Sequence, residues 1–274
     1  MEIICHFAIP LEQKLSDFLE ENKVMYQKFD MPDGEPYASF DITEASPAYA
    51  RFMQMQITTE KPIKNTKFSE EERQRAQWLT CTPITAKLNL CREDVSFTLS
   101  ERFGDGLAHH RTMTGAPFFV AAPISKRPNQ HFFTADETPN HLFCTEYAKN
   151  LLARRKLPLD FRAVQHARTG EPVGDLYDIR ILETLPVEAL DLSNSEETFV
   201  CPVCGAITFL PPLQLQIRRS FLENMSQMCT TAAAFGWGGN YTAPMNLISH
   251  DLFLYLSGNK LTRGLRIEPV KLID

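Results

Sequence analysis

The sequence lacks the segments that mark a membrane or secreted protein. No stretch approaches the roughly 18 uncharged apolar residues that a membrane helix needs. The first residues, MEIICHFAIPLEQ, carry no basic segment, and His6 and Pro10 interrupt their apolar run, so no signal peptide is predicted. Seven cysteines, an odd number with one closely spaced pair, indicate reduced thiols. We therefore expect a cytoplasmic protein with no membrane partner.

The sequence also lacks an excess of positive charge. It has 28 Lys and Arg against 34 Asp and Glu, which gives a formal net charge of -6. Nucleic-acid binders normally carry a basic stripe that neutralises phosphates. We therefore expect no nucleic-acid partner, and the acidic balance favours a basic partner or none in particular.

Signatures of catalysis are missing as well. There is no G-x-S-x-G elbow, and the Gly-rich segment FGWGGN (235–240) lacks the Lys-Ser/Thr of a phosphate-binding loop. The adjacent His109 and His110 point apart on a strand or loop, so they do not form a metal pair. We predict no catalytic and no cofactor-binding residues. An enzyme with its site in the N-terminal half stays open as the alternative, with His109, His110 or Cys81 beside a carboxylate.

What the sequence does contain is an ordinary globular composition over 274 residues, 43% apolar and 23% charged. Residues 2–9 are typical of a strand, and 11–22 place Leu and Phe on one helical face. Ser69 followed by Glu72 is a capping box that begins a helix. Short strands and helices alternate without a βαβ rhythm, so we predict an α+β fold with mixed or antiparallel sheets. We divide it into an N-terminal region, 1–130, and a C-terminal domain, 131–274.

Two segments of the C-terminal half resemble each other. Residues 142–164 match 247–270, with Glu146 against Asp251, and then a one-residue insertion before the last strand. Each segment predicts a strand, a short helix and a second strand, and Ser249 is a plausible N-cap. The match predicts two similar strand–helix–strand units. Either they form an internal repeat, or the similarity is that of any two such units.

The segment FVCPVCGAITF holds Cys201 and Cys204 with Gly205 directly after them, a knuckle that supplies half of a structural zinc site. No second pair of this spacing exists. Cys229 and His250 are the candidates for the remaining ligands, ahead of single cysteines elsewhere. The alternatives are a knuckle without metal, or a redox pair; the segment AITFLPP cannot form the helix that a redox motif opens.

The order CPVCG, FGWGGN and LISHDLFLYLSGNKLTRGLRIEPVKL resembles the C-terminal part of the double-CxxCG motif immunity proteins of bacterial polymorphic toxin systems. The resemblance covers roughly 141–274, and residues 1–140 contain no CxxCG, so only Cys201, Cys204 and Gly205 carry over. It implies a protein that neutralises a cognate toxin by direct binding, and the acidic net charge of this chain favours a basic toxin. If the family holds zinc with two knuckles, this chain keeps only half of that site or completes it with single ligands. A non-catalytic regulatory or scaffold module is a further alternative.

Overall fold

The structure is a computed structural model. It describes residues 1–58, 61–84, 86–91, 97–98, 112–113, 115–121, 130–135, 138–193, 195, 198–200, 207–236 and 242–274. The chain forms two compact units, Met1–Glu72 and Arg73–Asp274, which we call the N-terminal unit and the second unit. The predicted boundary at residue 130 falls inside the second unit. The predicted α+β class with mixed and antiparallel sheets is confirmed.

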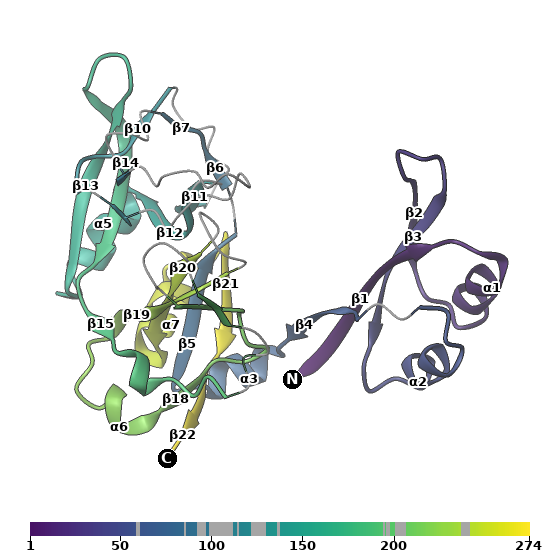
Figure 1. The fold of residues 1–274 in the computed structure, drawn as a ribbon. Coiled ribbons are helices and arrows are strands. Elements are labelled where there is room, and N and C mark those ends of the chain that lie inside the picture. Colours follow the sequence, from purple (N-terminus) through teal and green to yellow (C-terminus); the bar gives the residue numbers. More distant parts are fainter. Residues whose placement is uncertain are drawn as a thin grey trace. The chain divides into compact units, whose positions relative to one another are not determined.

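The N-terminal unit has the β-α-β-β-α-β order of the ferredoxin-like fold (Figure 1). Its four-stranded sheet has the order β2-β3-β1-β4, with every neighbouring pair antiparallel. The predicted strand and helix at its start are both present. The elements are β1 (Glu2–Pro10), α1 (Gln13–Glu21), β2 (Tyr26–Asp30), β3 (Pro36–Thr43), α2 (Pro47–Gln54) and β4 (Ile63–Lys67).

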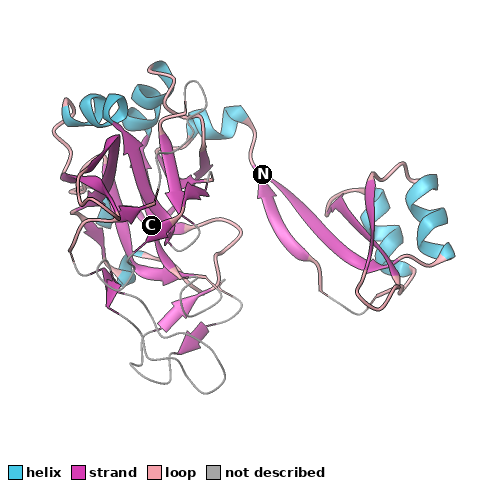
Figure 2. Cartoon of the chain, turned by 90° about the horizontal axis from the view of Figure 1, so that it is seen from above, coloured by secondary structure: helices cyan, strands magenta, loops and turns pink. Residues whose placement is uncertain are grey.

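Both helices of this unit lie on one side of the sheet (Figure 2). Alternate residues of β1 and β3 point at them, because side chains alternate between the two faces of a strand. The ring of Phe52 in α2 fills the centre, with its centroid 4.7 Å from that of Phe7 and 5.6 Å from that of Phe40. The opposite face of the sheet carries polar and aromatic side chains, including Tyr37 and His6; His6 is hydrogen-bonded to Asp41 at 2.8 Å.

The second unit contains two larger sheets, of order β6-β11-β12-β14-β13-β10-β7 and β16-β17-β19-β20-β5-β21. The predicted capping box is present before the helix that crosses the boundary between the two units: the Glu72 amide donates to Ser69 Oγ, and the Ser69 amide donates to the Glu72 carboxylate. The elements are α3 (Glu70–Arg75), β5 (Trp78–Pro83), β6 (Ala86–Leu88), β7 (Leu90–Cys91), β8 (Phe97–Thr98), β9 (Thr112–Met113), β10 (Phe119–Val120), β11 (Phe132–Ala135), β12 (Thr138–Thr145), α5 (Glu146–Ala153), β13 (Leu159–His166), β14 (Pro172–Ile181), β15 (Thr184–Leu185), a 3-10 turn (Val187–Ala189), β16 (Thr198–Val200), β17 (Ile207–Phe209), β18 (Gln216–Arg218), α6 (Arg219–Leu222), β19 (Met228–Phe235), β20 (Ala243–Ser249), α7 (His250–Gly258), β21 (Leu265–Pro269) and β22 (Lys271–Ile273).

The two predicted strand–helix–strand units are confirmed as β12-α5-β13 and β20-α7-β21. In each, a third strand lies between the two outer strands and is antiparallel to both: β14 in the first unit and β5 in the second. Each helix begins with a hydroxyl cap, Thr145 accepting from the Ala148 amide and Ser249 from the Leu252 amide.

The similarity extends far beyond these units, over 77–167 and 175–273, which we call the first and second repeats. Strand β6 pairs in parallel with β11 in one sheet, and β15 pairs in parallel with β19 in the other. Three main-chain hydrogen bonds recur at corresponding places. In the first pair, the Thr145 amide donates to the His131 carbonyl, as the Ser249 amide does to Gln227. In the second pair, the Leu182 amide donates to Pro158, as the Ile84 amide does to Gly264. In the third pair, the Gln165 amide donates to Phe118, as the Lys271 amide does to Leu215.

The predicted alignment of the two units was wrong by one residue within the helices. It set Glu146 against Asp251, whereas the first helical residues are Glu146 and His250. The backbone supplies the better markers. Lys156 and Lys260 each adopt a left-handed conformation after the helix, with φ of 54° and 57°, and a leucine follows each of them. Exposed charges on a helix are free to vary, but a cap and a left-handed turn are geometric requirements.

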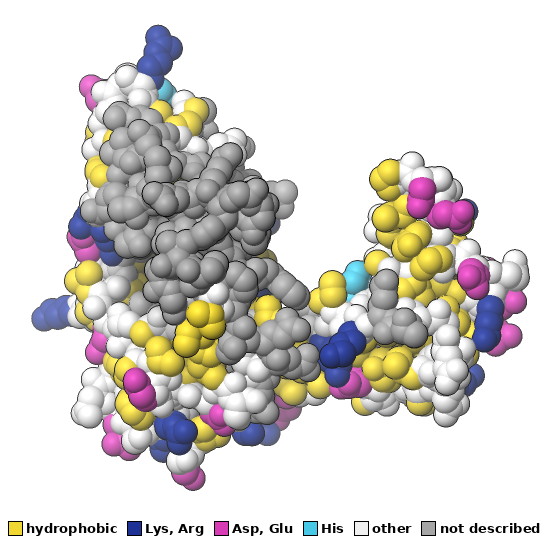
Figure 3. Space-filling view, viewed as in Figure 1, with side chains coloured by type: hydrophobic (Ala, Val, Ile, Leu, Met, Phe, Trp, Pro, Cys, Tyr) yellow, Lys and Arg dark blue, Asp and Glu magenta, His cyan; other side chains and the backbone are white. Residues whose placement is uncertain are grey.

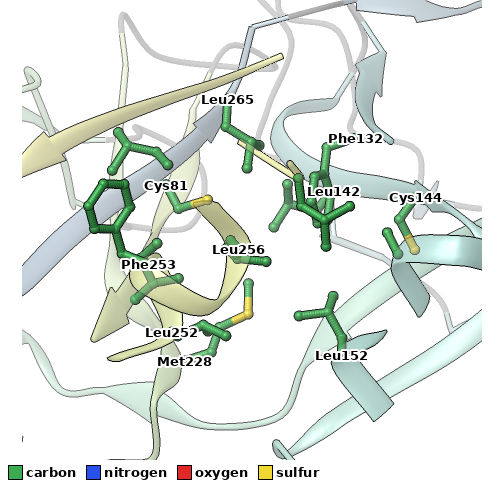
Figure 4. Close-up of a cluster of buried hydrophobic side chains, with 14 of the residues drawn as sticks. Cys81, Phe132, Leu142, Cys144, Leu152, Met228, Leu252, Phe253, Leu256 and Leu265 are labelled. Atoms are coloured by element: carbon green, nitrogen blue, oxygen red, sulfur yellow. The ribbon is translucent and has the colours of Figure 1, made fainter. Parts of the chain in front are cut away.

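The two repeats exchange their first strands. Strand β5 belongs to the first repeat but lies between β20 and β21 of the second, and β14 belongs to the second repeat but lies between β12 and β13 of the first. Side chains of both repeats therefore share one core (Figure 4), where Leu152 of α5 and Leu256 of α7 are both buried. The Tyr255 hydroxyl donates to the Leu151 carbonyl at 3.1 Å and ties α7 to α5.

This exchange predicts how the chain behaves when it is cut at the exposed turn between β13 and β14. Co-expressed fragments 1–169 and 170–274 are expected to associate in a 1:1 complex, because each supplies the central strand of the other's sheet. Affinity purification through a tag on one fragment measures the association. The exchange would be contradicted if each fragment, purified alone, protected the amides of its own helix and outer strands from hydrogen exchange.

Candidate functional site

The predicted zinc ligands are only partly within the described residues. Cys201 and Cys204 lie outside them, as does Gly205. Cys229 lies in β19 and is buried in a cluster of apolar side chains with Leu247 and Phe235. His250 is the first residue of α7, and its ring lies 6.2 Å from that of Phe253. Within the described residues, no three His, Cys, Asp or Glu side chains are grouped closely enough to hold a metal ion.

The residues named for the enzyme alternative are similarly divided. His109 and His110 lie outside the described residues. Cys81 is in β5, 2% exposed, within the core shared by the two repeats. Burial raises the pKa of Cys81 to about 12, and burial also raises the pKa of Cys229 to about 12. Both side chains are therefore neutral thiols near pH 7, a weak form for a nucleophile.

A buried ionic network that the sequence analysis missed lies on β12 and β14. Asp178 is completely buried; one carboxylate oxygen contacts His141 Nε2, and the other accepts from Arg180 Nε at 3.2 Å. The His141 ring packs against Phe118 and Phe143, with centroids 5.1 Å and 4.9 Å away. The other end of Arg180 donates to the Ala116 carbonyl. The network thus ties the segment before β10 to the middle of the sheet.

This network occurs in one repeat only. When the registers of the two sheets are compared, Thr80 occupies the position equivalent to Asp178, and Met245 the position equivalent to His141. Because the second sheet forms the same pairings without these charges, the fold does not require them. The strand segment DLYDIRIL gives little sign of the network, because Asp178 shares its side of the strand with Arg180 rather than with Tyr177 and Ile179.

The N-terminal unit holds the net negative charge of the whole chain. Residues 1–72 contain seven Lys and Arg and fourteen Asp and Glu, a formal charge of -7, whereas residues 73–274 contain 21 and 20, a charge of +1. Whole-chain composition could not reveal this division, because the unit boundary was predicted at residue 130. Charge of one sign concentrated on a small unit attracts partners of the opposite sign.

The same unit presents an edge strand rich in exposed apolar side chains. Every residue of β2 is exposed, and β2 is the outermost strand of its sheet. Around it, Met25 is 89% exposed, Phe29 37% and Met31 38%. Yellow side chains cover much of the visible face of this unit in Figure 3, with magenta acidic residues toward its margin.

A hollow of about 610 Å³ opens where β2 begins. It is bounded by the turn after α1 (Lys23–Met25), by the end of β3 (Asp41–Thr43) and by the start of α2 at Ser46. β3 extends three residues past Phe40, which is the partner of the first residue of β2. The hollow therefore lies in line with β2, where the sheet has room for more chain. We take the β2 edge and this hollow as the candidate binding surface.

None of the helices in the described residues is long and apolar enough to cross a membrane. Comparison of the chain with known protein families, with curated proteins and with solved structures finds no significant match in any of the three.

Replacing Asp178 by Asn is expected to lower the free energy of unfolding by about 3–5 kcal/mol, because it leaves Arg180 without its buried counter-charge. Urea denaturation followed by circular dichroism measures the change. The matched control is Asp160→Asn, whose carboxylate is 42% exposed and pairs with Arg162 at 2.9 Å. An exposed pair contributes about 0–1 kcal/mol. Equal effects of the two substitutions would contradict a buried network.

The raised cysteine pKa values predict the pattern of alkylation. At pH 8, iodoacetamide is expected to leave Cys81 and Cys229 unmodified in the folded protein and to label both in urea, because each thiol loses its proton only near pH 12 when folded. Peptide mass spectrometry reads the modification site by site. Labelling of Cys81 in the folded state at the rate seen in urea would overturn this and restore the enzyme alternative.

Proposed function

We propose that this protein is a non-catalytic immunity protein that acts in the cytoplasm and neutralises a cognate toxin by direct binding. The observation that carries the proposal is the separation of charge between the two units, with -7 on the N-terminal unit and +1 on the second. The resemblance of 141–274 to double-CxxCG motif immunity proteins supports it independently, because it concerns the other unit.

The two units have properties that suit different tasks in such a protein. In the second unit the exchanged strands and shared core produce a scaffold in which neither repeat can open alone. In the N-terminal unit an acidic surface surrounds an exposed strand edge. In this proposal the acidic unit meets a basic toxin and covers its active site or its substrate channel. Zinc at Cys201 and Cys204 is part of the proposal only as a structural ion.

Opposite charges chiefly raise the rate of encounter between two proteins, by up to a few orders of magnitude at low salt. A protein that must capture a toxin before it acts gains from a fast association rate. The concentration of acidic residues on 72 residues, rather than their dilution over the whole surface, strengthens the local field. The proposal therefore includes a binding rate that falls as salt screens the charges.

The test is to co-express the chain with the toxin candidate encoded directly beside its gene. Cells that carry both genes are expected to grow, whereas cells with the toxin alone or with an unrelated toxin and this chain stop growing. Purified partners should associate at least tenfold more slowly at 500 mM than at 50 mM NaCl. A gene neighbourhood of metabolic enzymes, or toxicity unaffected by the chain, would contradict the proposal.

A further inference from the structure

We propose that the outer edge of β2 is the docking site and that a basic, extended segment of the partner occupies it as a fifth strand of the sheet. The inference deepens the proposed function, on which it rests for the identity of the partner as a toxin. The surface and the charge of its occupant depend on features of the N-terminal unit alone.

The main chain of β2 offers the groups that an added strand needs. The Met31 amide donates to Glu35 on the β3 side, and neighbouring residues of a strand point their amides in alternate directions. The amide and carbonyl groups of Tyr26, Lys28 and Asp30 therefore face away from β3. Within the described residues no strand pairs with this side. Added strands are held mainly by such main-chain hydrogen bonds.

The side chains around the edge offer apolar contact on the sheet's uncovered face. Phe29 and Tyr37, which are cross-strand partners, have ring centroids 5.9 Å apart. Met25 and Met31 extend the apolar surface at the two ends of β2, and methionine adapts to differently shaped partners. The 610 Å³ hollow beyond Tyr26 adjoins the start of this edge.

Charge identifies the occupant as basic. Acidic residues outnumber basic ones around the edge: Glu20 and Glu21 precede β2, and Asp30, Asp33 and Glu35 lie at the hairpin that follows, against Lys23 and Lys28. A second copy of this chain would bring the same excess of acidic residues to the edge, so pairing of β2 with itself meets repulsion. A segment bearing lysine or arginine meets attraction at both ends.

The opposite edge of the same sheet is built in the contrary way. The segment KPIKNTK that contains β4 has three lysines and no acidic residue, and one of them, Lys64, pairs with Glu44 at 2.8 Å. Lysines on an edge strand are a common protection against unwanted pairing. A basic segment is therefore repelled at β4 and attracted at β2. The two edges provide an internal comparison within one small unit.

The probe is a fluorescein-labelled ten-residue peptide of alternating lysine and valine, titrated with the full chain by fluorescence polarisation. The same peptide with glutamate in place of lysine is the charge control. We expect the lysine peptide to bind at least tenfold more tightly than the glutamate peptide at 50 mM NaCl. Its affinity should fall at least tenfold at 300 mM. Equal affinities of the two peptides would reject a basic occupant.

The variant Lys28→Pro removes an outward amide in the middle of β2 and leaves the pairing with β3 intact. It makes the edge more acidic, so a loss of binding cannot be attributed to weaker attraction. The matched control, Thr66→Pro, removes the corresponding outward amide of β4. Lys28→Pro is expected to weaken peptide binding at least tenfold, and Thr66→Pro less than twofold. Equal affinities of the two variants would overturn the docking site.

A measurement on the unaltered chain covers the case in which Lys28→Pro fails to fold. Hydrogen exchange followed by NMR should show fast exchange of the Tyr26, Lys28 and Asp30 amides, slowed at least tenfold by the lysine peptide. No slowing would overturn the docking site. The proposal would also be overturned if analytical ultracentrifugation showed a dimer in which these amides are protected, because the occupant would then be a second copy of the chain. Neutralisation of the toxin by unaltered chain and Lys28→Pro alike would reject the surface but keep the proposed function, whereas failure of the unaltered chain to neutralise rejects the function alone.

Discussion

The exchange of first strands between the two repeats is the constraint on which the second unit depends. Each central strand satisfies the main-chain hydrogen bonds of two outer strands that belong to the other repeat. Neither strand–helix–strand unit can close its sheet from its own sequence, so the repeats must fold together. The buried side chains also come from both repeats, because α5 and α7 both pack against the core that the exchange creates. A chain built this way has one cooperative body from Arg73 onward rather than two halves.

That cooperative body accommodates differences between its two repeats, even at buried positions. The ionic network around Asp178 occupies a position that the other repeat fills with Thr80, and the sheet forms in both cases. Because the two repeats form similar sheets, a feature found in one repeat only is not required for the fold. The network stabilises one face by anchoring the segment before β10 to the sheet. Its asymmetry shows where the repeats have diverged, although it does not by itself supply a reactive group.

Sequence reasoning succeeded where local geometry is dictated by a few residues. Ser249 as an N-cap and the Ser69–Glu72 capping box were both predicted correctly, since each depends on atoms within four residues. It also gave the two strand–helix–strand units. It could not give the exchange, because the pairing of β5 with β20 joins residues more than 160 positions apart and leaves no local pattern. The boundary at residue 130 differs from the structure for the same reason. The candidate zinc ligands Cys201 and Cys204 stay a prediction.

The candidate binding surface was also beyond sequence reasoning, for a physical reason. An edge strand is defined by the absence of a neighbour on one side, which is a property of the sheet order and not of the strand's own residues. In the sequence, Met25, Phe29 and Met31 alternate with the charged Lys28 and Asp30, and this pattern does not say whether the strand has one neighbour or two. Only when β2 is placed outermost do these side chains become an exposed apolar surface. The acidic residues around them then oppose self-association, because hydrophobic contact alone would favour pairing between the β2 edges of two molecules. Selectivity for a basic occupant follows from that repulsion as much as from attraction.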